Sequence, residues 1–167
     1  LAHAPGGTFY RTWAHFLWMG DRTRFPGSAH VEFARGLANP IGIKCGPSIE
    51  PDLLPRLLDT LNPEREPGRI TLISRMGADR VEALVPPLIR SIKASGHPVL
   101  WSCDPMHGNT VKAANGYKTR PFGRILDEVR AFFAVTRAEG VRPGGIHVEM
   151  TGQDVTECTG GARAISE

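Results

Sequence analysis

Side chains that could do chemistry lie within or directly after short apolar runs along the chain. The clearest case is WSCDPMHGNT, residues 101–110, in which an apolar start gives way to Asp104 and His107. Carboxylate, imidazole and cationic groups bind anions and metals or transfer protons. The same placement recurs at four other apolar runs, and the groups concerned there are Asp21, Arg22, Lys44, Arg75, His147 and Glu149.

Arg22, Lys44 and Arg75 predict an anion-binding site. Three cations directed into one shared site would repel one another unless a negative group were bound between them. Phosphate or carboxylate suits this role, because an arginine binds such groups with two parallel hydrogen bonds and lysine adds a point charge. The alternative for each cation is an ion pair with a neighbouring carboxylate, or a side chain that reaches to water. Three cations at equivalent positions favour the anion site.

His107 and Glu149 are suitable ligands for a divalent metal, although two ligands alone are a weak signal. A histidine in a polar loop is more often a hydrogen-bonding residue. Asp104 would either orient His107 or cap the following segment. His147 lies two residues before Glu149 and hence on the same side of a strand. It is either a further polar contact or a satisfied core histidine, and both interpretations stay open.

Two cations in the motif GYKTR, Lys118 and Arg120, lie beyond the same strand as WSC. They belong either to a solvated loop or to a second phosphate site. Cys45 and Cys103 are interpreted as small buried hydrophobes rather than ligands or nucleophiles, and Cys158 stays undecided. The chain has no GxSxG elbow, P-loop or GxGxxG motif, so a hydrolase or nucleotide-binding protein has no support.

The elements that must position these side chains alternate between apolar runs and stretches with helical spacing. The predicted strands cover residues 15–20, 41–46, 69–75, 98–103 and 145–150, and the predicted helices 30–38, 51–61, 79–95 and 122–140. The pair Pro86 and Pro87 should kink or restart the third helix. Such alternation is typical of βαβ units in a parallel sheet, in which all strand C-termini open on one face. The side chains named above are therefore expected to converge.

Composition limits the class of protein. The 167 residues, 41% hydrophobic and 22% charged, suit one globular domain but are too few for a complete eight-stranded α/β barrel. The 20 basic and 17 acidic residues leave a charge of +3 with no basic run interleaved with aromatics, so nucleic acid is not an expected partner. Three widely spaced cysteines without a CxxC pair indicate a reducing cytosol. No stretch approaches the roughly 20 apolar residues that span a bilayer, and the first residues have no signal-peptide layout, so a membrane is not expected either.

Six motifs together resemble a known family. They are WMGDRTR, NPIGIKCGP, RITLISRMG, WSCDPMHGNT, GYKTR and GGIHVEMTGQDVTECTGG. In order and spacing, and over nearly the whole chain, they resemble the plant-type, or class II, 3-deoxy-D-arabino-heptulosonate 7-phosphate (DAHP) synthases. The resemblance implies a (β/α)8 TIM-type barrel that condenses phosphoenolpyruvate with erythrose 4-phosphate, the first step of the shikimate pathway to aromatic amino acids. It further implies a cytoplasmic transferase that needs a divalent metal such as manganese or cobalt, and that acts as a homo-oligomer or with a complementing chain.

The matching motifs also imply roles for individual residues. Arg22, Lys44 and Arg75 match family residues that hold phosphoenolpyruvate. His107 and Glu149 match two metal ligands. Of these residues, Lys44 and His107 are expected to take part in catalysis.

Two further site residues follow from the same resemblance. Lys118 falls in a motif near the aldose phosphate and the metal water, and is expected to bind substrate and to take part in catalysis. Asp21 stands where the family has Glu, so a shorter acid is expected to contact the substrate.

The resemblance covers only strands three to seven of the family barrel. The family's remaining metal ligands, a Cys on the first strand and an Asp on the last, have no counterpart in the chain. The expected architecture is a single partial (β/α) barrel domain over residues 1–167. Three explanations stay open: an excerpt of a longer enzyme, a short homologue completed by another chain, or a non-catalytic homologue that binds a phosphometabolite or a partner. The first is favoured, because every retained motif keeps residues suited to the chemistry.

Overall fold

A five-stranded parallel sheet forms the centre of the protein. A computed structural model describes residues 1–3, 7–150, 152–153 and 157–162. The strands of the sheet, in spatial order, are β3 (Leu17–Met19), β4 (Ile41–Cys45), β5 (Ile70–Ser74), β6 (Leu100–Cys103) and β9 (Pro143–Ile146). Every neighbouring pair is parallel, and the spatial order follows the chain. The predicted α/β class is therefore confirmed.

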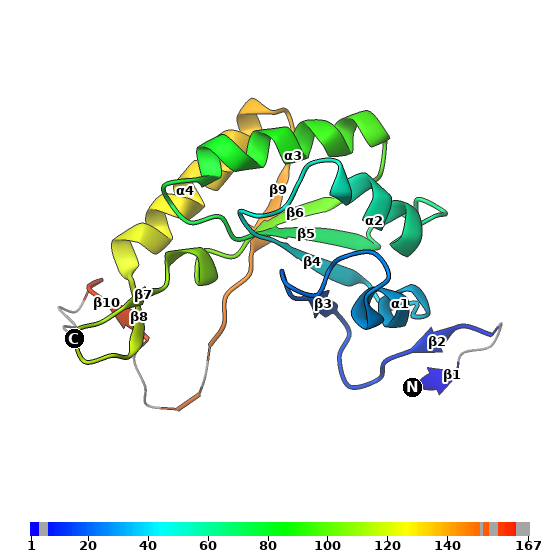
Figure 1. The fold of residues 1–167 in the computed structure, drawn as a ribbon, viewed down its shortest axis with the longest axis horizontal. Helices are drawn as coiled ribbons and strands as arrows, with labels where there is room; N and C mark the ends of the chain where they lie inside the picture. Colours follow the sequence, from blue (N-terminus) through cyan, green and yellow to red (C-terminus); the bar gives the residue numbers. More distant parts are fainter. Residues whose placement is uncertain (4–6, 151, 154–156, 163–167) are drawn as a thin grey trace.

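Four helices of the described chain connect these strands. They are α1 (Ala29–Arg35), α2 (Leu53–Leu61), α3 (Val81–Ser95) and α4 (Phe122–Ala138). Parallel strands taken in order and joined by right-handed crossovers place every helix on the same side of the sheet. Figure 1 shows the helices gathered on one side, each beside the next one in the chain. The sheet ends at β3 and β9 without closing, so the fold is an open part of a barrel.

The hydrophobic core lies between the sheet and the helices, and the spacing of apolar residues explains it. Helix α2 buries Leu54, Leu57, Leu58 and Leu61, which follow the i, i+3, i+4, i+7 pattern of one helix face. Strand β4 is buried along its whole length. One face of the sheet thus carries the core, and the other face is left for polar side chains such as Lys44.

Helix α3 runs from Val81 to Ser95 with Pro86 and Pro87 inside it. Of the two predicted effects of the prolines, a kink or a restart, the restart is therefore wrong. Proline lacks the N–H that would bond the carbonyl four residues earlier, which affects the carbonyls of Glu82 and Ala83. Both of these residues are exposed. Water can therefore satisfy their carbonyls, and the packed face of the helix is unaffected.

The fifth strand lies earlier in the chain than predicted. β9 ends at Ile146, whereas the apolar pattern extends to residue 150. The His147 N–H adds one further hydrogen bond, 2.7 Å long, to the carbonyl of Cys103. β6 ends at Cys103, and β9 is an edge strand with no other neighbour. Pairing stops there, so Glu149 lies on an extension beyond the strand.

Two smaller sheets in the structure were not predicted. β1 (Ala2–His3) pairs with β2 (Phe9–Tyr10), β7 (Val111–Lys112) pairs with β8 (Lys118–Pro121), and β10 (Cys158–Thr159) joins β8 in parallel. The segment interpreted as a possible solvated loop is thus a hairpin, which lies beyond β6 (Figure 1). None of the helices that the structure describes has the length and apolar character needed to cross a membrane.

Candidate active site

A cavity of about 710 Å³ opens at the C-terminal ends of the central strands. The predicted site residues that line it are Asp21, Arg22, Lys44, Arg75, Asp104, His107 and Lys118. Together with Arg120, the lining holds five cationic side chains against two carboxylates. Six of these residues lie at or after the C-terminal ends of β3, β4, β5 and β6, which the parallel sheet brings together as expected. Lys118 and Arg120 come from the hairpin strand β8.

Asp104 is fully buried beside this cavity and accepts four hydrogen bonds. Its Oδ2 accepts from the Lys44 ammonium and from Nδ1 of His107, the latter at 2.7 Å. Its Oδ1 accepts the backbone N–H groups of Met106 at 3.0 Å and of His107 at 3.2 Å. Burial acts to raise the pKa of Asp104, but the hydrogen bond and charge of Lys44 and the charge of His107 hold it below its ordinary value. One anion therefore fixes Lys44 and His107 relative to each other.

His107 turns its other ring nitrogen toward Glu149. Nε2 of His107 lies 3.3 Å from Oε1 of Glu149. Because Asp104 occupies Nδ1, Nε2 is the nitrogen left for a metal. A carboxylate behind a ligating histidine is a common arrangement in metal sites. The two predicted metal donors thus lie together, with Asp104 in the place of an orienting group.

The described residues supply two candidate metal donors and not a complete metal site. No group of three or more His, Cys, Asp or Glu side chains suited to a metal ion occurs in the described part of the chain. Zinc sites in proteins use at least three protein ligands. Hard cations such as calcium take about six to eight oxygen ligands. His107 and Glu149 therefore fit a divalent metal only with donors from elsewhere.

Asp21 is a second carboxylate that gathers donors at the cavity. Its Oδ1 accepts from Nη2 of Arg24 at 2.7 Å and from the N–H of Gly46 at 2.8 Å, and its Oδ2 lies 3.3 Å from Nη1 of Arg75. Arg24 is buried and also donates to the carbonyl of Lys44 at 2.9 Å. A Cβ at Gly46 would lie 2.5 Å from Asp21 Oδ2, so the close approach requires glycine there. Asp21 thus joins the segment after β3 to the ends of β4 and β5.

Two of the three predicted anion-binding cations have carboxylate partners. Lys44 pairs with Asp104 and Arg75 pairs with Asp21, as the alternative interpretation of these cations allowed. Both nevertheless line the cavity, so pairing fixes their positions without withdrawing them from it. Nε of Arg75 is buried and has no hydrogen-bond partner among the described residues. Arg22, the third cation, is exposed at the cavity.

The hairpin β7–β8 contributes two cations that differ in their surroundings. Arg120 donates to Glu157 at 2.6 Å and to the carbonyl of Met106 at 3.0 Å, so it ties the hairpin to neighbouring segments. Lys118 is exposed and also lines the cavity. The interpretation of this segment as a second phosphate site therefore depends mainly on Lys118.

His147 is half-buried and contacts Trp18, which lines the cavity. Its ring meets the ring of Trp18 edge-on, with 5.9 Å between the centroids, and Nζ of Lys44 lies 5.0 Å from the Trp18 ring centroid. Burial, followed by the charge of Lys44, lowers the pKa of His147. Trp18 belongs to one edge strand of the sheet and His147 follows the other. The sheet is therefore curved enough to bring side chains from its two edges into contact.

The buried cysteines carry no reactive thiol. Cys45 and Cys103 are both fully buried in the core between sheet and helices. Burial raises the pKa of the Cys45 thiol to about 12 and raises that of Cys103 as well. Because the thiolate is the form that attacks electrophiles and binds metals, neither role suits these residues. The expectation that both are small buried hydrophobes is confirmed, and Cys158 is partly buried in β10.

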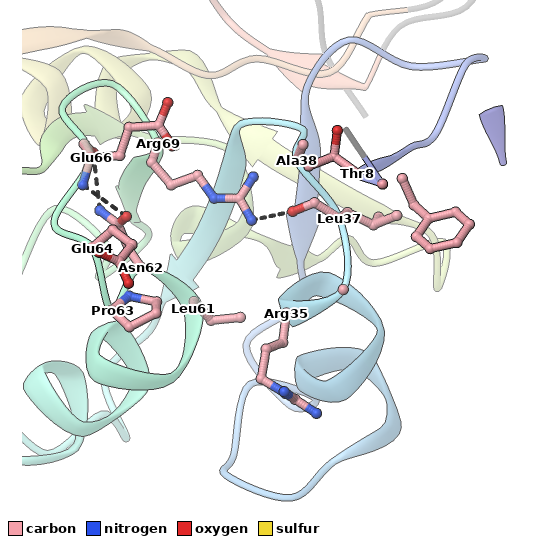
Figure 2. A pocket seen from close by; sticks show the side chains of 13 residues that line it. Thr8, Arg35, Leu37, Ala38, Leu61, Asn62, Pro63, Glu64, Glu66 and Arg69 are labelled. Carbon is pink, nitrogen blue, oxygen red and sulfur yellow. Dashed lines mark hydrogen bonds between the residues drawn. The ribbon is translucent and has the colours of Figure 1, made fainter. Parts of the chain in front are cut away.

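A second hollow, of about 330 Å³, lies at the opposite ends of the strands, between the segments that precede β4 and β5 (Figure 2). Arg69 points across it and donates to the carbonyls of Leu37 and Asn39. Asn62 and Glu66 close a turn beside it through two hydrogen bonds of 3.0 Å. Because the Arg69 guanidinium is hydrogen-bonded to backbone carbonyls, it holds the two segments together, and we interpret this hollow as structural.

Three residues at the site were missed by sequence reasoning. Trp18 and Thr110 line the cavity, and the buried Arg24 supports it from behind through Asp21. Arg24 had a signal, because WMGDRTR places it two residues after Arg22 and three after Asp21. Trp18 had none, since an aromatic residue in an apolar run is usually core.

Comparison with known proteins agrees with this geometry. The model of the Class-II DAHP synthetase family matches residues 2–167. A phospho-2-dehydro-3-deoxyheptonate aldolase of Mycolicibacterium smegmatis is 56% identical over 154 residues, which cover 92% of the chain and 33% of that protein. The Streptomyces coelicolor protein of the same description is 52% identical over 159 residues, covering 95% of the chain and 35% of that protein. The chain thus spans about a third of the length of these relatives, and it belongs to the class-II DAHP synthetase family.

Proposed function

We propose that the chain carries a large part of the active site of a DAHP synthase, which condenses phosphoenolpyruvate with erythrose 4-phosphate. The observation that supports this most directly is the cavity in which Lys44 and His107 share one buried carboxylate. Lys44 belongs to the cationic part of the lining, and His107 belongs to the pair of metal donors. Both substrates are phosphorylated anions, which matches a lining that is mostly cationic.

Phosphoenolpyruvate would bind to Arg22, Lys44 and Arg75. It carries a carboxylate and a phosphate, and the two guanidinium groups can each hold one anionic group with two hydrogen bonds. Lys44 and Arg75 are already held by Asp104 and Asp21, so little reorganisation is needed when the substrate arrives.

A divalent metal, manganese or cobalt, would be held by His107 and Glu149 with further donors from outside the described residues. When bound, it would polarise the aldehyde of erythrose 4-phosphate as a Lewis acid. Asp104 orients His107 for this role, because it accepts a hydrogen bond from Nδ1 and leaves Nε2 directed at Glu149.

The reaction joins C3 of phosphoenolpyruvate to the aldehyde carbon of the aldose phosphate. Water then adds at C2 and inorganic phosphate leaves, so one water is consumed and one phosphate is released for each product. Lys118, exposed at the cavity, is placed to contact the aldose phosphate. Lys44 lies where it can neutralise negative charge that develops on the reacting atoms. Holding both substrates against each other supplies the remaining advantage.

The second candidate function is a non-catalytic module that binds a phosphometabolite or a partner. It is favoured by one observation, namely that the described residues offer only two metal donors. Such a module would still use the cationic cavity. It would bind phosphoenolpyruvate without consuming it.

The deciding assay follows the ultraviolet absorbance of phosphoenolpyruvate after addition of erythrose 4-phosphate and Mn²⁺. We expect turnover that is abolished by His107→Ala and unchanged by His30→Ala, a substitution of an exposed histidine on α1. Phosphoenolpyruvate binding without turnover would favour the module, or a fragment of a longer enzyme, instead. Absence of both binding and turnover would refute the anion site itself.

A further inference from the structure

Helix α4 directs a carboxylate into the core. Its buried residues are Ile125, Glu128, Phe132 and Thr136, a single stripe at helical spacing. Glu128 is fully buried in this stripe, at a position where the pattern calls for an apolar side chain. A buried carboxylate is costly unless it is fully hydrogen-bonded, so its partners indicate why it is there.

Glu128 bonds the two segments that carry Arg75 and His107. Its Oε1 accepts the backbone N–H groups of Met76 and Gly77, each at 2.9 Å. Its Oε2 accepts from Nδ2 of Asn109 at 2.6 Å. Met76 directly follows Arg75, and Asn109 lies two residues after His107. One side chain thus holds the segments after β5 and after β6 from behind the cavity.

Asn109 has a fixed orientation in this arrangement. Its Oδ1 accepts the N–H of Ala78 at 3.0 Å, and its Nδ2 donates to the carbonyl of Pro105 at 2.8 Å as well as to Glu128. Exchanging the amide oxygen and nitrogen would set donor against donor at Ala78 and acceptor against acceptor at Pro105. Glu128 must therefore present an acceptor to Asn109.

The two segments also touch each other directly. A Cβ at Gly108 would lie 2.3 Å from the backbone nitrogen of Gly77, and a Cβ at Gly77 would lie 2.7 Å from the carbonyl oxygen of Gly108. No side chain separates the backbones, and Nη2 of Arg75 lies 3.3 Å from the carbonyl oxygen of His107. The relative position of Arg75 and His107 is thus set by this contact and by Glu128 behind it.

We propose that Glu128 is a positioning residue for the active site, which joins the segment of Arg75 to the segment of His107 and so sets the distance between the anion-binding group and the metal donor. What these two groups bind rests on the proposed function, but the joining of the segments does not. Only a carboxylate satisfies this position. Two N–H groups occupy one oxygen and the amide of Asn109 occupies the other, so a glutamine would turn its own NH₂ toward one of these donors.

The test compares Glu128→Gln with two controls on the same helix. Thr136→Val is the matched control, because Thr136 is also fully buried and polar, yet its hydroxyl bonds only the carbonyls of Phe132 and Phe133 within the helix. Asp127→Asn changes an exposed neighbouring carboxylate. Two quantities are measured on the full chain. The first is amide hydrogen exchange at residues 76–78 and 107–109, together with the NMR signal of the Arg75 Nε–H. The second is the dissociation constant for phosphoenolpyruvate by calorimetry.

We expect Glu128→Gln to speed exchange in both segments about tenfold or more and to broaden the Arg75 signal. Phosphoenolpyruvate should bind about 10- to 100-fold more weakly, the range by which loss of the groups that orient metal ligands lowers metal affinity or activity. Thr136→Val and Asp127→Asn should leave both quantities near the wild-type values. Exchange in Glu128→Gln that matches Thr136→Val would overturn the inference, and so would loosened segments with unchanged affinity.

Two further outcomes are also decisive. If the wild-type chain does not bind phosphoenolpyruvate, the proposed function fails, and the exchange rates and the Arg75 signal alone judge the role of Glu128. If Glu128→Gln does not fold, Asn109→Ala takes its place, because it removes the bond from Glu128 to the second segment and keeps the bonds to Met76 and Gly77. It also removes the bonds of Asn109 to Ala78 and Pro105, so residues 76 and 77 report on the first segment. Faster exchange at residues 107–109, with residues 76 and 77 unchanged, would support the inference. Unchanged exchange at residues 107–109 would refute it.

Discussion

Replacing Asp104 with Asn tests whether one buried carboxylate holds the site together. The substitution preserves the size of the side chain and removes the charge beside Lys44, whose side chain is only 4% exposed. Each oxygen of Asp104 accepts two hydrogen bonds. An asparagine must turn its NH₂ toward one of these pairs of donors. In the variant, the buried Lys44 ammonium therefore has no counter-charge. The new NH₂ group also faces hydrogen-bond donors that need an acceptor.

The expected loss of stability is large. Removing one partner of a buried ion pair costs about 3–5 kcal/mol, because the remaining charge stays buried without compensation. Domains of ordinary size unfold with roughly 5–15 kcal/mol in total, so Asp104→Asn should remove a large share of the free energy of unfolding. Adding Lys44→Met to Asp104→Asn removes both charges. The double variant should therefore be more stable than Asp104→Asn alone.

Urea unfolding at pH 7, followed by tryptophan fluorescence, measures these differences. Asp79→Asn serves as the control, because it breaks an ion pair with Arg124 at a carboxylate whose side chain is 73% exposed, where screening by water leaves little stabilisation to lose. The reasoning would be refuted if Asp104→Asn lost no more stability than Asp79→Asn. A double variant less stable than Asp104→Asn would equally contradict the role assigned to Lys44.

Three further predictions follow from other parts of the structure. Folding lowers the pKa of Asp104 from its ordinary value of 3.8, so its stabilisation is complete above that pH and is lost as the pH falls through the folded-state pKa. Unfolding measured from pH 7 to pH 2 should therefore show a steeper loss at acid pH for the wild-type chain than for Asp104→Asn. Gly108→Ala should cost about 1–3 kcal/mol or more through its clash with Gly77, whereas Gly123→Ala, where a Cβ meets nothing within 4 Å, should be neutral or stabilising in the same unfolding assay. A thiol reagent applied to the native chain should label one of the three cysteines, Cys158, and labelling of Cys45 or Cys103 without unfolding would contradict their burial.

The strands and helices of the central sheet could be predicted because their signals are local. An apolar run of five residues indicates a buried strand, and a leucine repeat such as that of α2 indicates a helix. The hairpin β7–β8 carries no such signal, since its strands, VK and KTRP, contain no apolar run. The early end of β9 depends on where its neighbour β6 ends, and the sequence of β9 alone does not contain that information.

The convergence of the site residues could also be predicted, because parallel strands open on one face whatever their side chains are. The pairing among them could not. Lys44 and Asp104 are 60 positions apart in the chain, and no pattern in either segment predicts their ion pair. Glu128, in contrast, had a signal in the sequence. It lies three positions after Ile125 and four before Phe132, so a carboxylate stood on the apolar stripe of the clearest helix.

The four cations that we propose bind the substrates fall into two kinds, which would contribute differently to binding. Lys44 and Arg75 are held by Asp104 and Asp21 before any ligand arrives, so their side-chain entropy has already been lost in folding. Arg22 and Lys118 are exposed, and a ligand that engages them must order long side chains at its own cost. The fixed pair therefore sets where an anion binds and how it is oriented, because fixed donors cannot follow a misplaced ligand. The exposed pair adds attraction over a range of positions, and it can adapt to whichever second anion shares the cavity.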